Sequence, residues 1–249
     1  MLVARTMGAE PPNGESGRLA ANLATAQWMA DYDRVAWEST DLLTKEDKDA
    51  LRKVSTVWFC AKAKGTWYAF YGEDTDHGYQ TAFCYAEDSG RVCHRVPPPL
   101  LPDRDRFAQA ITRTLAPVQE LTRQTTVRFN YYVRSEGDRV AVYYTPGLQP
   151  DGKLAYGIER TEWVDGASGK VVSEWVHGQV LRGIVPGRDR KLVLDLGDCA
   201  VPSPQAIFTM LANRETFGAI VARCQGGDFG LKTLDGKIAC VPVPAPSAL

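Results

Sequence analysis

The sequence predicts an α+β fold in which antiparallel meander sheets carry helices packed on one face. Two stretches, 56–96 and 127–176, alternate apolar and polar residues as strands do. Apolar residues at helical spacing precede each stretch, over 18–36 and 104–121. The last third, 186–241, adds short strands around one short helix. Strands and helices that group together, rather than alternate one for one, are typical of the α+β class.

The similar order of the two stretches predicts a tandem repeat of helix plus four strands. Thr-Val-Trp-Phe at 56–59 resembles Thr-Val-Arg-Phe at 126–129, and each begins a hairpin. The alternative is a single larger antiparallel sheet with helices on one face. The expected parts are a flexible N-terminal tail (1–16), a first helix plus four-strand unit (17–99), a second such unit (100–185), a C-terminal β-rich segment (186–241) and a flexible tail (242–249).

In the first unit, Thr44 and Asp47 have the spacing of a capping box, which predicts a short helix that ends near Lys53. Lys64 and Gly65 then form the first hairpin turn. The strands expected around this turn and after it are 56–59, 67–71, 79–86 and 91–96.

The second unit begins with a helix in which Pro117 should cause a kink or an early end. Its first hairpin has the polar turn 135–138. If those four residues close the hairpin, Val133 faces Val140 and the side chains of alternate residues share one face. The strands expected here are 127–134, 139–144, 153–164 and 170–176.

The C-terminal segment has weaker periodicity but clear boundary signals. Ser203 and Pro204 mark the start of a short helix. Asp235 and Gly236 form the strongest hairpin dipeptide in the chain. The strands expected in this segment are 191–195, 217–224, 229–233 and 237–241.

Charge and hydropathy exclude two classes of partner. The net charge is −1 and both signs are mixed along the chain, which is unlike a nucleic-acid or anionic-membrane binder. No apolar run approaches the ~20 residues that cross a bilayer. The first seven residues lack the apolar region of a secretory signal, so the chain is expected to be cytosolic or to follow a signal that lies outside it.

The cysteines are the most chemically specific feature, and none of the six forms a Cys-x-x-Cys motif. Cys84 and Cys93 flank a predicted turn. A turn centred on residues 88–89 places them directly opposite, whereas a turn one residue later makes them a diagonal pair that fits a bridge less easily. They therefore either form a disulfide or remain two small apolar thiols. Cys224 and Cys240 are expected on strands about 9 to 10 Å apart, which is too far for a bridge, so Cys199 is the better partner for one of them. A bridge would indicate an oxidising compartment.

The densest polar cluster, residues 72–78, lies in a predicted loop. Its members Glu73, Asp74, Asp76 and His77 could converge on a divalent cation or a substrate; the alternative is a solvated turn. The usual nucleophile, phosphate-loop, dinucleotide and zinc-protease motifs are absent from the sequence, so no cofactor is implied.

Both faces of the first hairpin carry aromatic rings, and Trp67 and Tyr71 share one of them, while the outer face of the second hairpin is rich in tyrosine and arginine. These faces either pack against helices and the other sheet, or form an exposed patch that contacts a ligand. The candidate binding residues are Trp67, Tyr71, Arg128, Tyr132, Arg134 and Tyr143.

Two resemblances accompany these patterns. Trp-Val-Asp-Gly-Ala-Ser-Gly-Lys-Val-Val at 163–172 resembles the strand-turn-strand signature of PepSY domains, which are small extracytoplasmic modules. The tandem layout of helices and four-strand meanders is similar to that of secreted β-lactamase inhibitor proteins. The second resemblance concerns architecture and transfers no residues to this chain.

The sequence therefore favours a non-enzymatic, periplasmic or secreted binding or inhibitor-like protein. It would engage a protein or small-molecule ligand through the aromatic and arginine-rich sheet face. One alternative is a hydrolase-like enzyme with its site around residues 72–78. Another is a structural subunit of a larger assembly.

Overall fold

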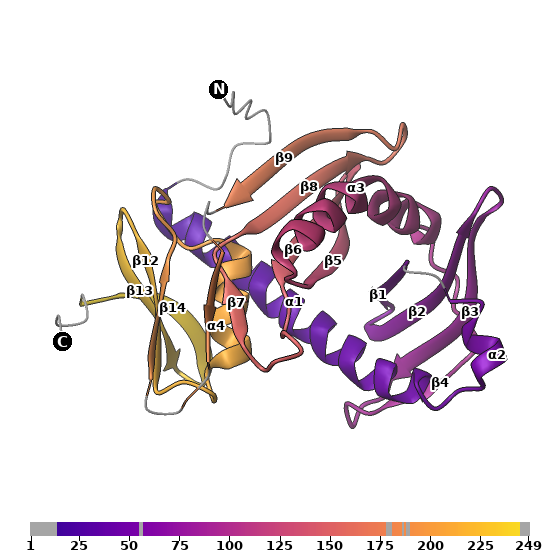
Figure 1. The fold of residues 1–249 in the computed structure, drawn as a ribbon, viewed down its shortest axis with the longest axis horizontal. Helices are drawn as coiled ribbons and strands as arrows, with labels where there is room; N and C mark the ends of the chain where they lie inside the picture. The colour runs from indigo at the N-terminus through magenta and orange to yellow at the C-terminus, as the bar shows by residue number, and fades with distance from the viewer. Residues whose placement is uncertain (1–13, 55–56, 178–180, 186, 188–189, 245–249) are drawn as a thin grey trace.

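The computed structural model describes residues 14–54, 57–177, 181–185, 187 and 190–244. It confirms the α+β class, with antiparallel sheets and a C-terminal β-rich segment (Figure 1). The expected tails lie mostly outside the described residues. Among the described residues, none of the helices has the length and apolar character needed to cross a membrane.

The first sheet has the order β1-β2-β3-β4 and is antiparallel throughout. The long helix α1 and the short helix α2 precede it. Lys64 and Gly65 have φ of 50° and 88°, the left-handed geometry that a two-residue hairpin turn requires. The bounds are α1 Glu15–Leu43, α2 Lys48–Leu51, β1 Trp58–Ala63, β2 Thr66–Thr75, β3 Gly78–Glu87 and β4 Cys93–Arg95.

The second sheet has the order β5-β6-β8-β9 and follows helix α3. The strand expected over 153–164 is divided, because Gly157 has a φ of 104° that breaks the extended chain. Its first part, β7, pairs with β10 instead. The bounds are α3 Arg104–Thr125, β5 Phe129–Glu136, β6 Arg139–Pro146, β7 Leu154–Tyr156, β8 Glu159–Asp165, β9 Val171–His177 and β10 Arg182–Ile184.

The C-terminal segment folds into a third four-stranded sheet of order β11-β12-β13-β14. Here β11 and β12 are parallel, and α4 forms the crossover between them. Ser203 caps α4 by accepting a hydrogen bond from the Ala206 amide at 2.9 Å, as its position before Pro204 predicts. The bounds are β11 Lys191–Asp195, α4 Pro204–Asn213, β12 Ala219–Cys224, β13 Gly227–Leu234 and β14 Lys237–Val243.

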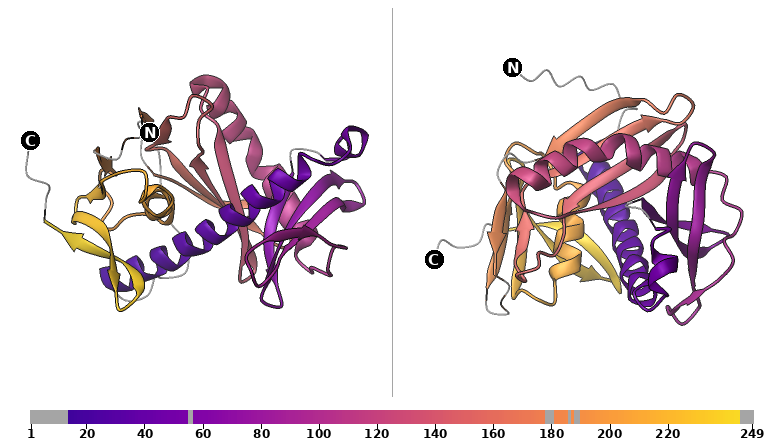
Figure 2. Two further views of the ribbon diagram at one scale, coloured as in Figure 1. Left: turned by 90° about the horizontal axis from the view of Figure 1, so that it is seen from below. Right: turned by 45° about the vertical axis from the view of Figure 1, so that its right-hand side comes forward.

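The helix α1 crosses the whole molecule. Figure 2 shows it running from the C-terminal sheet, where it packs on α4, to the first sheet. Between those ends it also contacts β5 of the second sheet. The helices, expected on one face, in fact lie on both: α1 and α3 cover opposite faces of the first two sheets. Both faces carry large aromatic side chains that a helix buries. Tyr143 contacts Trp28 of α1, and the next residue, Tyr144, hydrogen-bonds Thr114 of α3 on the other face.

Aromatic side chains join these layers. The Tyr71 hydroxyl lies 2.8 Å from the Ser39 hydroxyl of α1, while Phe59 contacts Phe107 of α3 with ring centroids 5.6 Å apart. The first two sheets meet at their edge strands β1 and β5, where the Tyr131 hydroxyl donates to the Trp58 carbonyl at 2.8 Å. The core is therefore continuous across helices and sheets.

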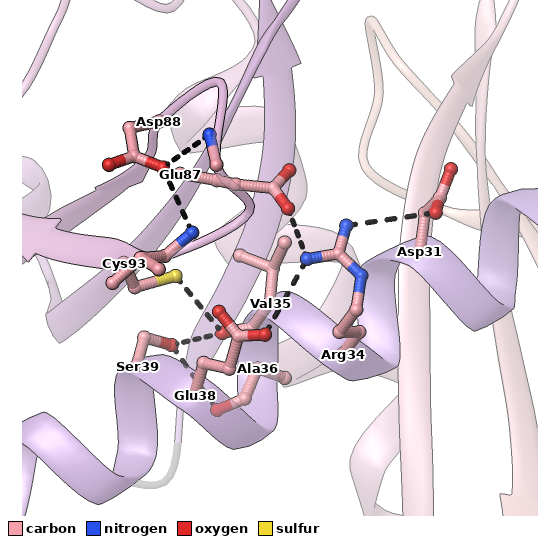
Figure 3. A network of polar contacts seen from close by, with 11 residues as sticks. Asp31, Arg34, Val35, Ala36, Glu38, Ser39, Glu87, Asp88 and Cys93 are labelled. Atoms are coloured by element: carbon pink, nitrogen blue, oxygen red, sulfur yellow. Dashed lines mark hydrogen bonds and ion pairs between the residues drawn. The ribbon is translucent and has the colours of Figure 1, made fainter.

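Ion pairs complete the contact between α1 and the first sheet (Figure 3). Arg34 of α1 pairs with Glu87 at the end of β3 and also lies near Asp31 and Glu38 on its own helix. The Cys93 thiol points at the carbonyl of Val35, with the sulfur 4.0 Å from the oxygen.

Three local expectations were wrong. The early end that was one of the two effects expected of Pro117 does not occur, because α3 continues to Thr125. The capping box does not form, because Asp47 alone caps α2, by accepting from the Asp49 and Ala50 amides. The β5–β6 turn is tighter than expected. Glu136 pairs with Arg139, so Val133 faces Val142 instead of Val140; this shift of two residues leaves each side chain on its expected face.

Candidate functional site

A groove lies where the second sheet meets the N-terminal half of α1 and the start of α4. We call it the aromatic groove; its volume is about 580 Å³. Its residues are Arg134, Tyr143, Thr161, Trp163 and Trp175 of the sheet, Arg18, Ala21, Asn22 and Thr25 of α1, and Asp198, Cys199, Ala200, Val201 and Pro204.

The sheet side of the groove is set by strand alternation. Thr161 pairs with Trp175, and Trp163 pairs with Ser173, so both tryptophans are on the same face of neighbouring strands. Both indoles are half-buried. The groove wall is therefore a ring-bearing surface that remains partly open to solvent.

Arg134 occupies the centre of the groove. Its guanidinium carbon lies 5.1 Å from the Trp28 ring centroid and 5.4 Å from that of Tyr143. A guanidinium close to two rings is held by cation–π attraction. It also donates through Nη2 to the Thr25 hydroxyl at 3.2 Å.

Glu136 holds the other groove residues in place. Its carboxylate accepts hydrogen bonds from Arg134 Nε at 2.8 Å, from the Tyr143 hydroxyl at 2.5 Å and from Trp163 Nε1 at 2.9 Å. Burial acts to raise the pKa of Glu136, but the bonds from Tyr143, Arg134 and Trp163 outweigh it, and the net pKa is lowered. Glu136 is thus an ionised positioning residue beneath the groove.

The opposite wall is tied down by contacts distant in sequence. Asn22 of α1 donates to the Pro202 carbonyl at 2.8 Å, and the buried Ser203 hydroxyl donates to Glu159 of β8 at 2.6 Å. The Gln205 amide nitrogen donates to the Thr161 hydroxyl at 2.7 Å. These bonds fix the segment before α4 against both α1 and the sheet.

A second groove lies on the other face of the same strands, and we call it the α3 groove. Its volume is about 440 Å³. Most of its surface is apolar or aliphatic, with Arg160 and Glu120 as its charged members. Its residues are Pro117, Val118, Glu120, Leu121, Gln124, Phe129, Tyr144, Ile158, Arg160 and Val176.

Strand β9 separates the two grooves and forms the edge of the second sheet (Figure 1). Among the described residues, no strand pairs with its outer edge. Its valines are unusually exposed: Val171 by 43%, Val172 by 49% and Val176 by 46%. Trp175 lines the aromatic groove and Val176 lines the α3 groove, as consecutive residues of a strand do.

The predicted aromatic binding face is largely covered. Trp67, Tyr71, Tyr132 and Tyr143 are at most 4% exposed, because α1 packs over them. The expectation of a broad exposed patch is therefore wrong. Tyr143 and Arg134 still line the aromatic groove, whereas Arg128 is exposed just before β5. No pattern used for the prediction identified Trp163 and Trp175 as groove residues, although their strand alternation could have done so.

The predicted loop 72–78 is not a loop. β2 and β3 extend into it and leave a two-residue turn, Asp76-His77. Glu73 and Asp74 are consecutive strand residues that point to opposite faces, and Asp74 accepts a hydrogen bond from Thr112 at 2.9 Å. Glu73, Asp74, Asp76 and His77 thus do not converge. The described residues include no group of three or more His, Cys, Asp or Glu side chains placed to hold a metal ion.

The expected opposition of Cys84 and Cys93 is also wrong. Cys93 pairs with Glu87, three residues from Cys84, and an odd shift puts the two side chains on opposite faces of the sheet. All six cysteines are free thiols. Cys199 and Cys224 are close enough for a side-chain hydrogen bond, which, with burial, raises the pKa of Cys224.

Comparisons with protein families, curated proteins and solved structures give no match to this chain. The function proposed next therefore rests on the geometry of the two grooves and of β9.

Proposed function

We propose that this chain is a non-enzymatic binding protein that takes up an extended segment of a partner protein along β9. The observation that carries the proposal is the position of β9: its outer edge is unpaired among the described residues, and it forms a wall of both grooves. The bound segment adds a fifth strand to the second sheet.

Edge pairing provides the backbone part of the interaction. The free N–H and C=O groups of an edge strand are a template for another strand. Seven residues of β9 span about 23 Å at ~3.3 Å per residue, which suits a segment of similar length. Val171, Val172 and Val176 present apolar surface around this edge.

The grooves provide the side-chain part. Successive side chains of a paired strand point to opposite faces, so they enter the aromatic groove and the α3 groove in turn. The aromatic groove offers Trp163, Trp175 and Tyr143 together with Arg134, the residue types that interfaces favour. Because Glu136 uses its carboxylate to hold these residues, the acidic group of the site supports binding rather than proton transfer.

Selection from a displayed library of ten-residue peptides, followed by calorimetry on the selected peptides, tests the proposal. Trp175→Ala should weaken the best peptide by about thirtyfold, as for an interface anchor. Trp175→Phe should keep most of the affinity. Leu148→Ala, at a residue that is 60% exposed and outside both grooves, is the control and should bind as the parent does.

Backbone pairing has its own test. Two versions of the selected peptide are compared, one N-methylated at its odd-numbered residues and the other at its even-numbered residues. Only the version whose methylated amides face β9 should lose binding, and the other should keep it. Failure to select peptides, or equal binding of the two methylated peptides, would contradict the proposal. Sedimentation showing a dimer that Trp175→Ala dissolves would assign the edge to a second copy of this chain instead.

The same proposal places the protein in an oxidising compartment, periplasmic or secreted. The contact between Cys199 and Cys224 supports an oxidising compartment, because two neighbouring thiols can be oxidised to a disulfide. In that reaction two electrons and two protons pass to an external disulfide, which is reduced to two thiols. Intact mass of protein from its native source, alkylated with and without reduction, tests this. Six thiols alkylated without reduction would remove the support.

A further inference from the structure

A smaller pocket lies away from both grooves, between α1 and the junction of β1 with β5. Its volume is about 180 Å³. It lies where the first two sheets meet edge to edge, so both sheets and the helix contribute walls. Its residues are Asp33, Ala36, Trp37 and Thr40 of α1, Trp58 of β1, and Asn130, Tyr131 and Tyr132 of β5.

The walls of this pocket are aromatic and rigid. Trp58 and Tyr131 have ring centroids 5.1 Å apart, and the Tyr131 hydroxyl bonds both the amide and the carbonyl of Trp58. Tyr132 is 1% exposed and packs on Tyr32. Trp37 is 54% exposed and stands at the mouth. The pocket thus has fixed inner rings and one accessible outer ring.

Asp33 is the one charged residue among those lining the pocket. Its carboxylate accepts a hydrogen bond from the Tyr132 hydroxyl at 2.9 Å. Burial raises the pKa of Asp33 despite bonds from Tyr132 and Trp37, and among the described residues no cation contributes to this balance. Its neighbour Arg34 is paired with Glu87 on the side facing the first sheet (Figure 3).

We propose that this pocket binds a small organic cation of the trimethylammonium or choline type. Aromatic rings attract a cation, and the Asp33 carboxylate beside them supplies the opposite charge. A metal ion fits the set poorly, because Asp33 is the single carboxylate among the lining residues.

The site is separate from the one proposed for the partner segment. The cation pocket and the aromatic groove both include residues of α1 and β5, but no residue lines both of them. The two proposals can therefore fail independently.

Calorimetric titration of the full chain with choline chloride tests the cation pocket. The neutral isostere 3,3-dimethylbutanol has the same shape without the charge and should bind about tenfold more weakly. Asp33→Asn keeps the size of the side chain and an acceptor for Tyr132 but removes the charge, so it should lower choline affinity about tenfold or more. Asp31→Asn, on the same helix outside the pocket, is the matched control and should bind as the parent does.

A second readout places the ligand. The indole N–H resonance assigned by Trp37→Phe should shift on addition of choline, and Trp37→Ala should weaken binding without unfolding the protein, because this side chain is more than half exposed. If choline at up to ~50 mM gives neither binding heat nor a shift of the Trp37 resonance, the proposal is overturned. Equal affinity for choline and for its neutral isostere would also overturn it.

Discussion

Replacement of Glu136 by glutamine probes the design of the aromatic groove. The carboxylate accepts hydrogen bonds from three side chains, with its Oε1 facing Arg134 and Tyr143 and its Oε2 facing Trp163. Glutamine keeps one carbonyl oxygen but presents an N–H donor where Trp163 also donates. The lost charge assistance and the unpaired donor should together cost about 2 kcal/mol of unfolding free energy.

The figure of about 2 kcal/mol takes into account that the Arg134–Glu136 ion pair is partly exposed. The side chains of Arg134 and Glu136 are each 29% exposed, so solvent screens the ion pair and the full cost of a buried pair does not apply. Urea unfolding at pH 7, followed by fluorescence, measures the difference. Glu215→Gln, at a side chain that is 90% exposed, should change the free energy by less than ~0.5 kcal/mol.

The pH dependence of the same difference identifies its source. The pKa of Glu136 is lowered in the folded protein, so its contribution is complete above the unfolded value of ~4.3 and is lost as pH falls toward the folded pKa. The gap between the parent and Glu136→Gln should therefore be largest at neutral pH and shrink below pH ~4. A gap that is absent at pH 7, or equal at pH 7 and pH 3.5, would refute this account of the groove.

Three further predictions concern other parts of the fold. Because burial raises the pKa of Asp33, its charge reduces stability as pH rises above ~3.9, so Asp33→Asn should unfold at a higher temperature than the parent at pH 7 and at the same temperature at pH 3; equal melting at both would contradict this. Gly72→Ala should destabilise by about 2 to 3 kcal/mol in urea unfolding, since its Cβ would lie 2.0 Å from the Gln80 carbonyl oxygen, whereas Gly183→Ala meets no atom within 4 Å. Native alkylation followed by peptide mapping should label Cys199 first, because the other five thiols are buried.

The faces of the strands could be predicted from the sequence, because side chains alternate with a period of two. The β5–β6 register was predicted two residues away from the observed one, and an even error leaves Val133 and Val142 on the expected face. The error for Cys84 and Cys93 was odd, so it reversed their relation and removed the predicted bridge. Turn length decides between these outcomes, and polar turns such as 135–138 and 88–92 do not define it from sequence alone.

The site could be predicted only in part. Arg134 and Tyr143 have the composition of an interface, and both line the aromatic groove. Trp67, Tyr71 and Tyr132 share that composition but lie beneath α1. The spacing of apolar residues in a helix identifies its buried stripe, but does not indicate that one helix will pack across two sheets.

The reach of α1 also bears on the order in which the chain can mature. Asn22 and its partner Pro202 are 180 residues apart, so the end of α1 that packs on α4 lacks its cover until most of the chain has been synthesised. At ~5 to 20 residues per second, this interval lasts roughly 10 to 40 s. During that time the apolar side of the N-terminal helix is available to a chaperone or to another nascent chain. Because synthesis proceeds from the N-terminus, α1 is the first helix to be made but one of the last to complete its packing.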